Sequence, residues 1–170
     1  MQMTEAITDY FVALFQGTIP KELIVFIISM FPILELRGGM IAAKLLGVQL
    51  WKAFIICYFG NILPIPFILL FIRRIFVFLK KFKPTEKLVS KIEIRSMRKS
   101  EKVRRGRNWG LLAFVAIPLP GTGGWTGALI AALLDIRMKA SLPIIALGVL
   151  IANLIMSVFS YGLLGLLGIG

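Results

Sequence analysis

Histidine is absent from this 170-residue chain, and cysteine occurs once, as Cys57. A disulfide within the chain, a histidine-based metal site and a Ser/His or Cys/His nucleophile are therefore excluded. Acidic residues are also scarce, with eight against 20 lysines and arginines. Because no recognisable catalytic constellation can be assembled, we expect no enzymatic activity, no metal ion and no cofactor.

Apolar residues, by contrast, make up 58% of the chain, and the mean hydropathy is +0.90. A protein of this length cannot hide so much apolar surface in one small core, so the composition predicts a protein embedded in a lipid bilayer. We expect residues 1–170 to form a single all-α membrane domain with several spans.

The positive charge is concentrated in one stretch. Between Arg73 and Arg107 there are fourteen Lys and Arg and three acidic residues, a net charge of +11. Long apolar segments flank this stretch, which is typical of a cytoplasmic loop under the positive-inside rule, so residues 73–109 are expected in the cytoplasm. We expect no nucleic-acid partner. The stretch could contain a helix resting on the anionic membrane surface or be a solvated linker.

The first sixteen residues carry apolar side chains at helical spacing, with polar ones elsewhere around the helix. Residues 4–16 therefore read as a short amphipathic helix lying at the membrane interface. The alternative is that they form the first turns of a longer membrane helix, although Gly17 and Pro20 argue against continuity.

Two apolar segments are interrupted by helix breakers. Residues 23–46 are long enough to cross a bilayer but contain Pro32 and Gly38-Gly39, so a re-entrant hairpin fits better than one straight span. Residues 111–134 contain a similar break between Pro118 and Gly127. A spanning helix follows each segment. The first covers residues 51–71 and is kinked between Gly60 and Pro66, and the second covers residues 142–167.

The two halves, about 20–72 and 110–170, thus follow the same plan. Gly38-x-x-Ile41-Ala42-Ala43-x-Leu45 also aligns with Gly127-x-x-Ile130-Ala131-Ala132-x-Leu134. With residues 73–109 in the cytoplasm, the first hairpin starts and ends outside and the second starts and ends inside. The halves would then be inverted repeats of opposite orientation, whose interface commonly holds a substrate near the midplane of the membrane. If residues 20–47 cross the membrane fully, the inversion fails.

Glu35 and Arg37 stand out because a charge at the bilayer centre is costly and usually faces a cavity or a partner. Two residues apart, they would point to different sides of a regular helix, so acting together requires the backbone to unwind there. Glu35 could bind substrate and exchange a proton, and Arg37 offers a planar fork of donors for phosphate or carboxylate. The alternative is a salt bridge that only holds the hairpin together.

Broken backbone at membrane depth survives only where it is packed in protein or lines a polar cavity. The run from Pro118 to Gly127 could present backbone N–H groups to an anion, assisted by two threonine hydroxyls. Close helix packing through Gly123-x-x-x-Gly127 is the alternative. The candidate substrate-binding residues are Glu35, Arg37, Gly38, Gly39, Pro118, Pro120, Gly121, Thr122, Gly123, Trp125 and Thr126. Asn61 and Asn153, single amides in apolar spans, are expected to be structural hydrogen-bonding residues.

Three motifs resemble those of the small multi-drug export protein family, a bacterial and archaeal group related to the DedA superfamily. They are Pro32-x-x-Glu35-Leu36-Arg37-Gly38-Gly39, Gly60-Asn61-Ile62-Leu63-Pro64-Ile65-Pro66-Phe67 and Phe114-Val115-Ala116-Ile117-Pro118-Leu119-Pro120-Gly121-Thr122-Gly123-Gly124-Trp125-Thr126-Gly127-Ala128. The resemblance covers nearly the whole chain. It implies a location in the cytoplasmic membrane of a prokaryote, two opposed re-entrant hairpins, proton dependence and, from the superfamily, movement of lipid carriers such as undecaprenyl phosphate.

These observations favour a transporter with a midplane site between opposed hairpins. The expected substrate is an anionic lipid, with Arg37 binding the head group and Glu35 exchanging a proton. One alternative is efflux of small amphipathic or cationic drugs, in which Glu35 is the binding charge and Arg37 its partner. Another is a non-transporting membrane scaffold whose basic stretch recruits anionic lipids or cytoplasmic partners. Membrane lipids are expected partners in each case, and a homodimer is plausible for so small a protein.

Overall fold

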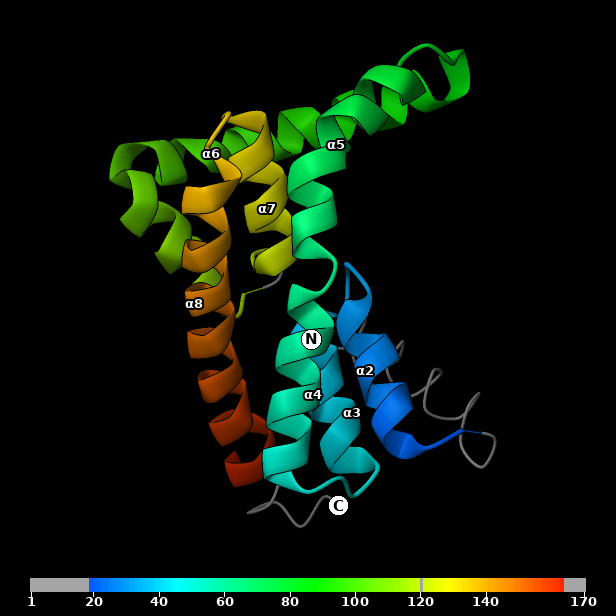
Figure 1. The fold of residues 1–170 in the computed structure, drawn as a ribbon, viewed down its shortest axis with the longest axis vertical. Coiled ribbons are helices and arrows are strands. Elements are labelled where there is room, and N and C mark those ends of the chain that lie inside the picture. Colours follow the sequence, from blue (N-terminus) through cyan, green and yellow to red (C-terminus); the bar gives the residue numbers. More distant parts are fainter. Residues whose placement is uncertain (1–18, 120, 164–170) are drawn as a thin grey trace.

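The computed structural model describes residues 19–119 and 121–163, and every regular element in these ranges is helical. The amphipathic helix predicted for residues 4–16 lies outside them, as does the end of the last predicted span. The fold is a bundle with a long arm at one end (Figure 1). Its core contains residues from both halves of the chain, among them Val25, Met40, Cys57, Ile65, Val115, Ile130 and Val149.

The first two described helices form a hairpin. Helices α2 (Lys21–Met30) and α3 (Glu35–Leu45) pack against each other and are joined by a turn at Pro32. The Lys21 Nζ donates a hydrogen bond to the carbonyl oxygen of Gly47 over 3.1 Å, so the hairpin starts and ends at the same end of the molecule. Gly38 and Gly39 lie inside α3 and do not interrupt it, so the break predicted there is wrong and Pro32 alone marks the turn.

A long apolar helix follows. Helices α4 (Leu50–Ile62) and α5 (Ile65–Leu79) are separated by a kink at Pro64, as predicted, and residues 50–72 are long and apolar enough to cross a membrane. Helix α8 (Met138–Ser157) continues as a π-helix over Val158–Leu163, and Met138–Gly162 passes the same test. Only 28% and 39% of the most apolar windows of these two spans are buried, whereas the core helix of a soluble protein is mostly buried.

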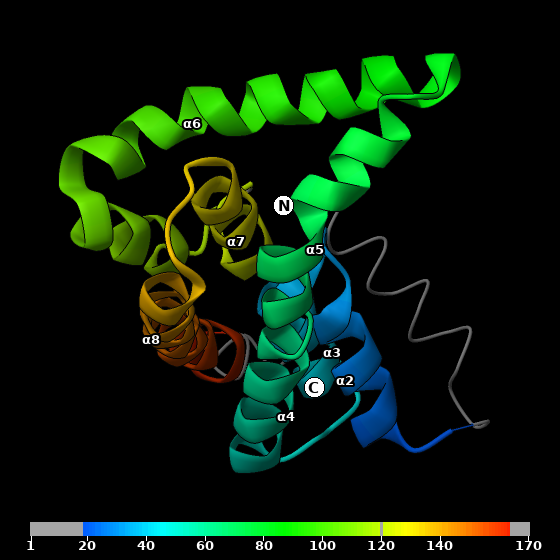
Figure 2. The same cartoon turned by 45° about the horizontal axis from the view of Figure 1, so that its top comes forward.

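The basic stretch is helical rather than a linker. Helix α5 extends through its first residues, and the 34-residue helix α6 (Lys83–Ala116) contains nearly all of the rest. Helix α6 runs across the end of the bundle and then bends down beside α7 (Gly124–Leu133) and α8 (Figure 2). The apolar residues of the stretch are too few to fix a helical face, so its sequence was compatible with both a helix and a linker.

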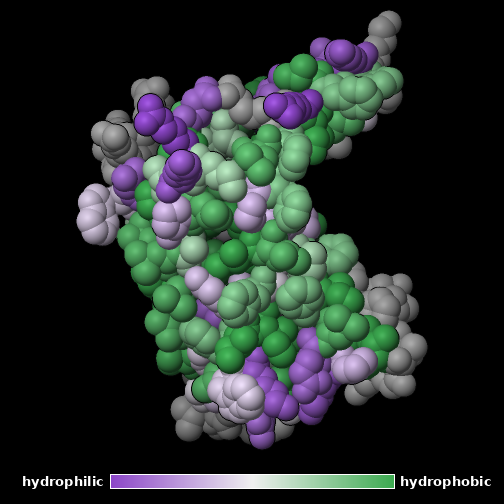
Figure 3. Space-filling view, in the orientation of Figure 1, coloured by the Kyte–Doolittle hydropathy of each residue, from purple (hydrophilic) through white to green (hydrophobic). Residues whose placement is uncertain are grey.

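The end of α6 and helix α7 form a second hairpin, whose turn includes residues 117–119 and 121–123. It descends from the end of the molecule where α6 crosses, while the α2–α3 hairpin rises from the other end, and the two tips meet near the middle (Figure 1). The space-filling view shows an apolar band at this middle level, with polar side chains gathered toward both ends (Figure 3).

Candidate functional site

The two hairpin tips contact each other through Glu35 and Arg37. We call this contact the tip junction and define it as Glu35, Arg37, Asn61 and the residues 117–119 and 121–125. Asn61 is the middle residue of the Leu50–Ile72 span. The tip junction therefore lies at the centre of the apolar band, at the depth where a charge costs most.

Glu35 is the first residue of α3 and is 2% exposed. Its backbone has φ of +49°, in the left-handed region that a residue with a side chain rarely adopts. Its N–H donates to the carbonyl oxygen of Phe31 over 2.8 Å, which closes the turn after Pro32. This conformation lets Glu35 and Arg37 both reach the second hairpin, although a regular helix would direct them to different sides. Strain of this kind gathers at functional sites.

The Glu35 carboxylate lies against the N-terminus of α7. The backbone N–H of Trp125 donates to its Oε1 over 3.3 Å, and the backbone of Gly124 also faces the carboxylate. Four backbone N–H groups at the start of a helix have no partner inside it, and the helix dipole favours a negative charge there. The anion-binding feature predicted for this run is therefore occupied by a carboxylate of the protein itself.

Gly123 and Gly124 permit this approach. Gly123 has φ of +127°, and a Cβ there would overlap the Glu35 carboxylate. A Cβ on Gly124 would come within 2.6 Å of the Asn61 Oδ1. Both positions therefore require glycine, the first for its backbone conformation and both for the close contact with the first half of the chain.

Arg37 contacts the other side of the same loop. Its guanidinium donates to the carbonyl oxygens of Leu119 and Thr122, the second over 2.6 Å. The Thr122 hydroxyl donates to the carbonyl oxygen of Ile117 over 2.7 Å, so this side chain shapes the loop rather than offering a free donor. Glu35 and Arg37 interact electrostatically, and each also makes its own contact across the tip junction.

The other predicted residues are placed less centrally. Gly38 and Gly39 pack away from the tip junction, since a Cβ would meet Leu34 at 2.8 Å in the first case and Ser29 and Cys57 in the second. Gly127 packs against α6, where a Cβ would lie 2.5 Å from Val115, which matches the packing alternative. Pro118, Gly121 and Thr126 are half-buried in the loop and the first turn of α7, and Pro120 lies outside the described residues.

Asn61 lies at the tip junction. It is fully buried and its amide faces the Glu35 carboxylate, but neither its oxygen nor its nitrogen has a hydrogen-bond partner among the described residues. The Trp125 Nε1 is also buried without a partner. Asn153, by contrast, donates from Nδ2 to the carbonyl oxygen of Phe54 over 2.8 Å, which joins α8 to α4. The sequence offered no signal that would separate these two asparagines.

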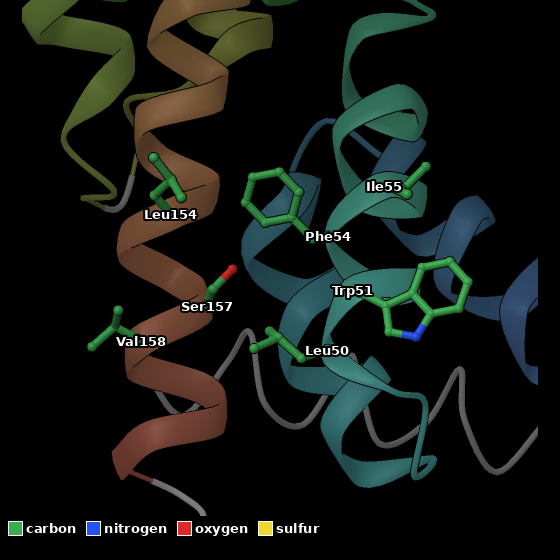
Figure 4. A pocket seen from close by; sticks show the side chains of 7 residues that line it. All are labelled: Leu50, Trp51, Phe54, Ile55, Leu154, Ser157 and Val158. Carbon is green, nitrogen blue, oxygen red and sulfur yellow. The ribbon is translucent and has the colours of Figure 1, made fainter.

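A groove of about 640 Å³ lies elsewhere, between α4 and α8. Figure 4 shows its lining, which is apolar apart from one hydroxyl: Leu50, Trp51, Phe54, Ile55, Leu154, Ser157 and Val158. It contains no residue of the tip junction. Its surface suits a hydrocarbon chain rather than a charged ligand.

The exposed apolar band, the two long spans and a buried charged contact at their centre define a helical membrane protein. A family model described as "Putative small multi-drug export protein" matches residues 35–155, a range that begins at Glu35, just after the turn of the first hairpin, and includes the second hairpin tip. The chain belongs to this family. No curated protein and no solved structure matches it.

Proposed function

We propose that this protein is a transporter of the cytoplasmic membrane of a prokaryote that exports small amphipathic compounds, with its substrate site at the tip junction. In this proposal both hairpins are re-entrant, and the two halves of the chain are inverted repeats around that site. The family description supports the export role. The basic end of the bundle, with α6, would face the cytoplasm under the positive-inside rule.

The observation that carries the proposal is the pair of charged contacts across the tip junction. Glu35 and Arg37 each bind the second hairpin through its backbone, at the centre of the span. A charged contact with a purely structural role would be costly at this depth. A charged contact that breaks and re-forms would open a path between the hairpins, first from one side of the membrane and then from the other. We assign Glu35 as the residue that exchanges a proton for substrate.

The favoured substrate is an amphipathic cation. A protonated Glu35 no longer carries the charge that the N-terminus of α7 attracts, so the tips can separate. Once the proton leaves, an organic cation can pair with the carboxylate in the opened site. Arg37 would remain on the loop carbonyls and hold the second hairpin together during this exchange.

Translocation of an anionic lipid such as undecaprenyl phosphate is the second candidate. Arg37 is half-buried. Its guanidinium could release the two loop carbonyl oxygens and bind a phosphate instead, because arginine binds a phosphate more strongly than a neutral carbonyl. The relation to the DedA superfamily that the motif resemblance implies for the small multi-drug export family supports this candidate. However, the donors of the α7 N-terminus already bind Glu35, so the phosphate would have to displace a carboxylate as well as two carbonyls.

The test uses proteoliposomes that carry an imposed pH gradient, with ethidium as the cationic probe and a fluorescent short-chain polyprenyl phosphate as the anionic probe. Wild type should move ethidium, Glu35→Gln should abolish this flux, and Arg37→Ala should retain part of it. Loss of polyprenyl phosphate movement in Arg37→Ala, with no ethidium flux in wild type, would establish the second candidate. Lys139→Gln, an exposed charge outside the tip junction, is the control. Equal flux with and without protein would favour a scaffold.

A further inference from the structure

The arm formed by the end of α5 and the start of α6 exposes apolar side chains that the protein does not cover. We define the arm as residues 73–94. Phe76 and Val89 are buried where the two helices pack, and the Lys80 Nζ lies 2.5 Å from the Glu93 Oε2. These contacts make the arm a hairpin of its own, which projects sideways beyond the bundle (Figures 1 and 2).

Among the arm side chains that the structure describes, five large apolar ones remain outside this small core. The exposed fractions of the two largest, Phe78 and Phe82, are 58% and 49%, and their rings pack edge to face with centroids 5.3 Å apart. The others are Ile75, Val77 and Ile94. An apolar surface of this kind on a segment with few contacts to the bundle indicates a binding surface rather than unused core.

Basic side chains surround these apolar ones. Arg74, Lys81, Lys87 and Lys91 are exposed on the arm, and Lys80 is paired with Glu93. Figure 3 shows both kinds of surface on the projecting arm. A helical surface that combines aromatic and aliphatic side chains with lysines matches the interface of a bilayer with anionic head groups, where the apolar groups enter the acyl boundary and the lysines bind phosphate.

The position of the arm fits the same partner. Helix α5 is continuous with the span that ends at Ile72, so the arm begins where the chain leaves the apolar band. A lateral projection at this level lies along the membrane surface rather than away from it. Aromatic side chains are enriched at such interfaces.

We propose that the arm is a docking surface for anionic lipid head groups on the membrane leaflet at the basic end of the bundle. Because α6 continues from the arm into the first leg of the second hairpin, lipid binding also fixes the end of the helix that carries that tip. This role does not depend on what the protein transports.

The test measures how far the arm is shielded from water in lipid nanodiscs. A fluorophore is attached through Phe78→Cys in a Cys57→Ala background of the full chain, and quenching by acrylamide, which is uncharged, is compared between discs of phosphatidylcholine alone and discs with phosphatidylglycerol. We expect quenching to fall at least about fivefold in the anionic discs, since each basic residue near such a surface favours binding by roughly that factor. High salt should restore quenching. A label on Ile155→Cys, in the exposed face of α8, reports a lipid-covered position.

The matched variants reverse two charges in different places. Lys81→Glu with Lys87→Glu should abolish the difference between the two kinds of disc. Lys21→Glu with Lys52→Glu, at the other end of the molecule, should leave it unchanged. Equal acrylamide quenching in both discs, whether high or low, would overturn the proposal. So would shielding that appears only when two proteins share a disc, because the arm would then bind a second copy.

Discussion

The Glu35 carboxylate accepts a hydrogen bond from the backbone N–H of Trp125, although 90 residues separate them in the chain. This contact joins the turn of one hairpin to the first turn of α7 in the other. The N-terminus of a helix can bind a free anion, but at α7 a carboxylate of the protein itself takes that place. Whatever moves through the tip junction must therefore compete with a group of the protein itself.

Gly123→Ala should disrupt this contact. The new Cβ would overlap the Glu35 carboxylate, and φ of +127° is a conformation that alanine rarely adopts. We expect the free energy of unfolding in mild detergent, measured by denaturant titration, to fall by about 2 to 4 kcal/mol.

Gly47→Ala is the matched control for Gly123→Ala. Gly47 also has a positive φ, +64°, but a Cβ there has nothing within 4 Å, so only the backbone strain remains and the loss should be about 1 kcal/mol. Equal losses in the two variants would mean that the contact with Glu35 does not restrict position 123.

Asn61→Leu should lower transport without lowering the free energy of unfolding. Neither polar atom of Asn61 has a hydrogen-bond partner of normal geometry among the described residues, although the amide faces the Glu35 carboxylate, so leucine removes two buried polar atoms at the cost of that one contact. We expect the free energy of unfolding to stay constant or to rise by about 1 kcal/mol, while ethidium flux in proteoliposomes falls.

Asn153→Leu provides the comparison for Asn61→Leu. It breaks the bond from Nδ2 to the Phe54 carbonyl and should cost about 1 kcal/mol, with little effect on flux per folded protein. If Asn61→Leu is the more destabilising of the two, Asn61 is a structural residue, as the sequence analysis expected.

The tip junction was predictable from the sequence because charge and helix breakers are rare at membrane depth. Pro32, Glu35 and Arg37 in one half and the run after Pro118 in the other are all exceptions in apolar segments, and the structure brings Glu35 and Arg37 into contact with that run. The kink at Pro64 followed from the missing backbone donor and the steric clash of proline.

Packing distances were not predictable in this way. Gly38 and Gly39 were read as a break in the helix, but they lie inside α3, where Leu34 leaves no room for a Cβ at position 38 and Ser29 and Cys57 leave none at position 39. The direction of Asn61 depends on which helix lies opposite it, and the sequence of one helix does not contain that information. The helical state of residues 83–116 depends on the way α6 packs on α7 and α8 at its far end.

Arg37→Lys should loosen the second hairpin tip without removing the charge. The guanidinium contacts the carbonyl oxygens of Leu119 and Thr122 together, whereas an ammonium group lacks the planar fork. We expect amide hydrogen exchange in the segment 117–123, followed by mass spectrometry, to become at least about tenfold faster, which corresponds to about 1.4 kcal/mol. Exchange in α2 should not change. Wild-type exchange rates in the segment would mean that one contact is sufficient.

Tyr161→Phe tests how the far end of α8 is held. The Tyr161 hydroxyl donates to the carbonyl oxygen of Val48 over 2.7 Å, which joins the π-helical segment to the turn between α3 and α4. Losing this bond should lower the free energy of unfolding by about 1 kcal/mol. The ring itself lies under Lys44, whose Nζ is 5.8 Å from the ring centroid, and phenylalanine keeps this interaction. Tyr161→Leu removes both and should cost roughly 0.5 to 1 kcal/mol more. Equal losses for the two variants would show that the hydroxyl alone holds the segment.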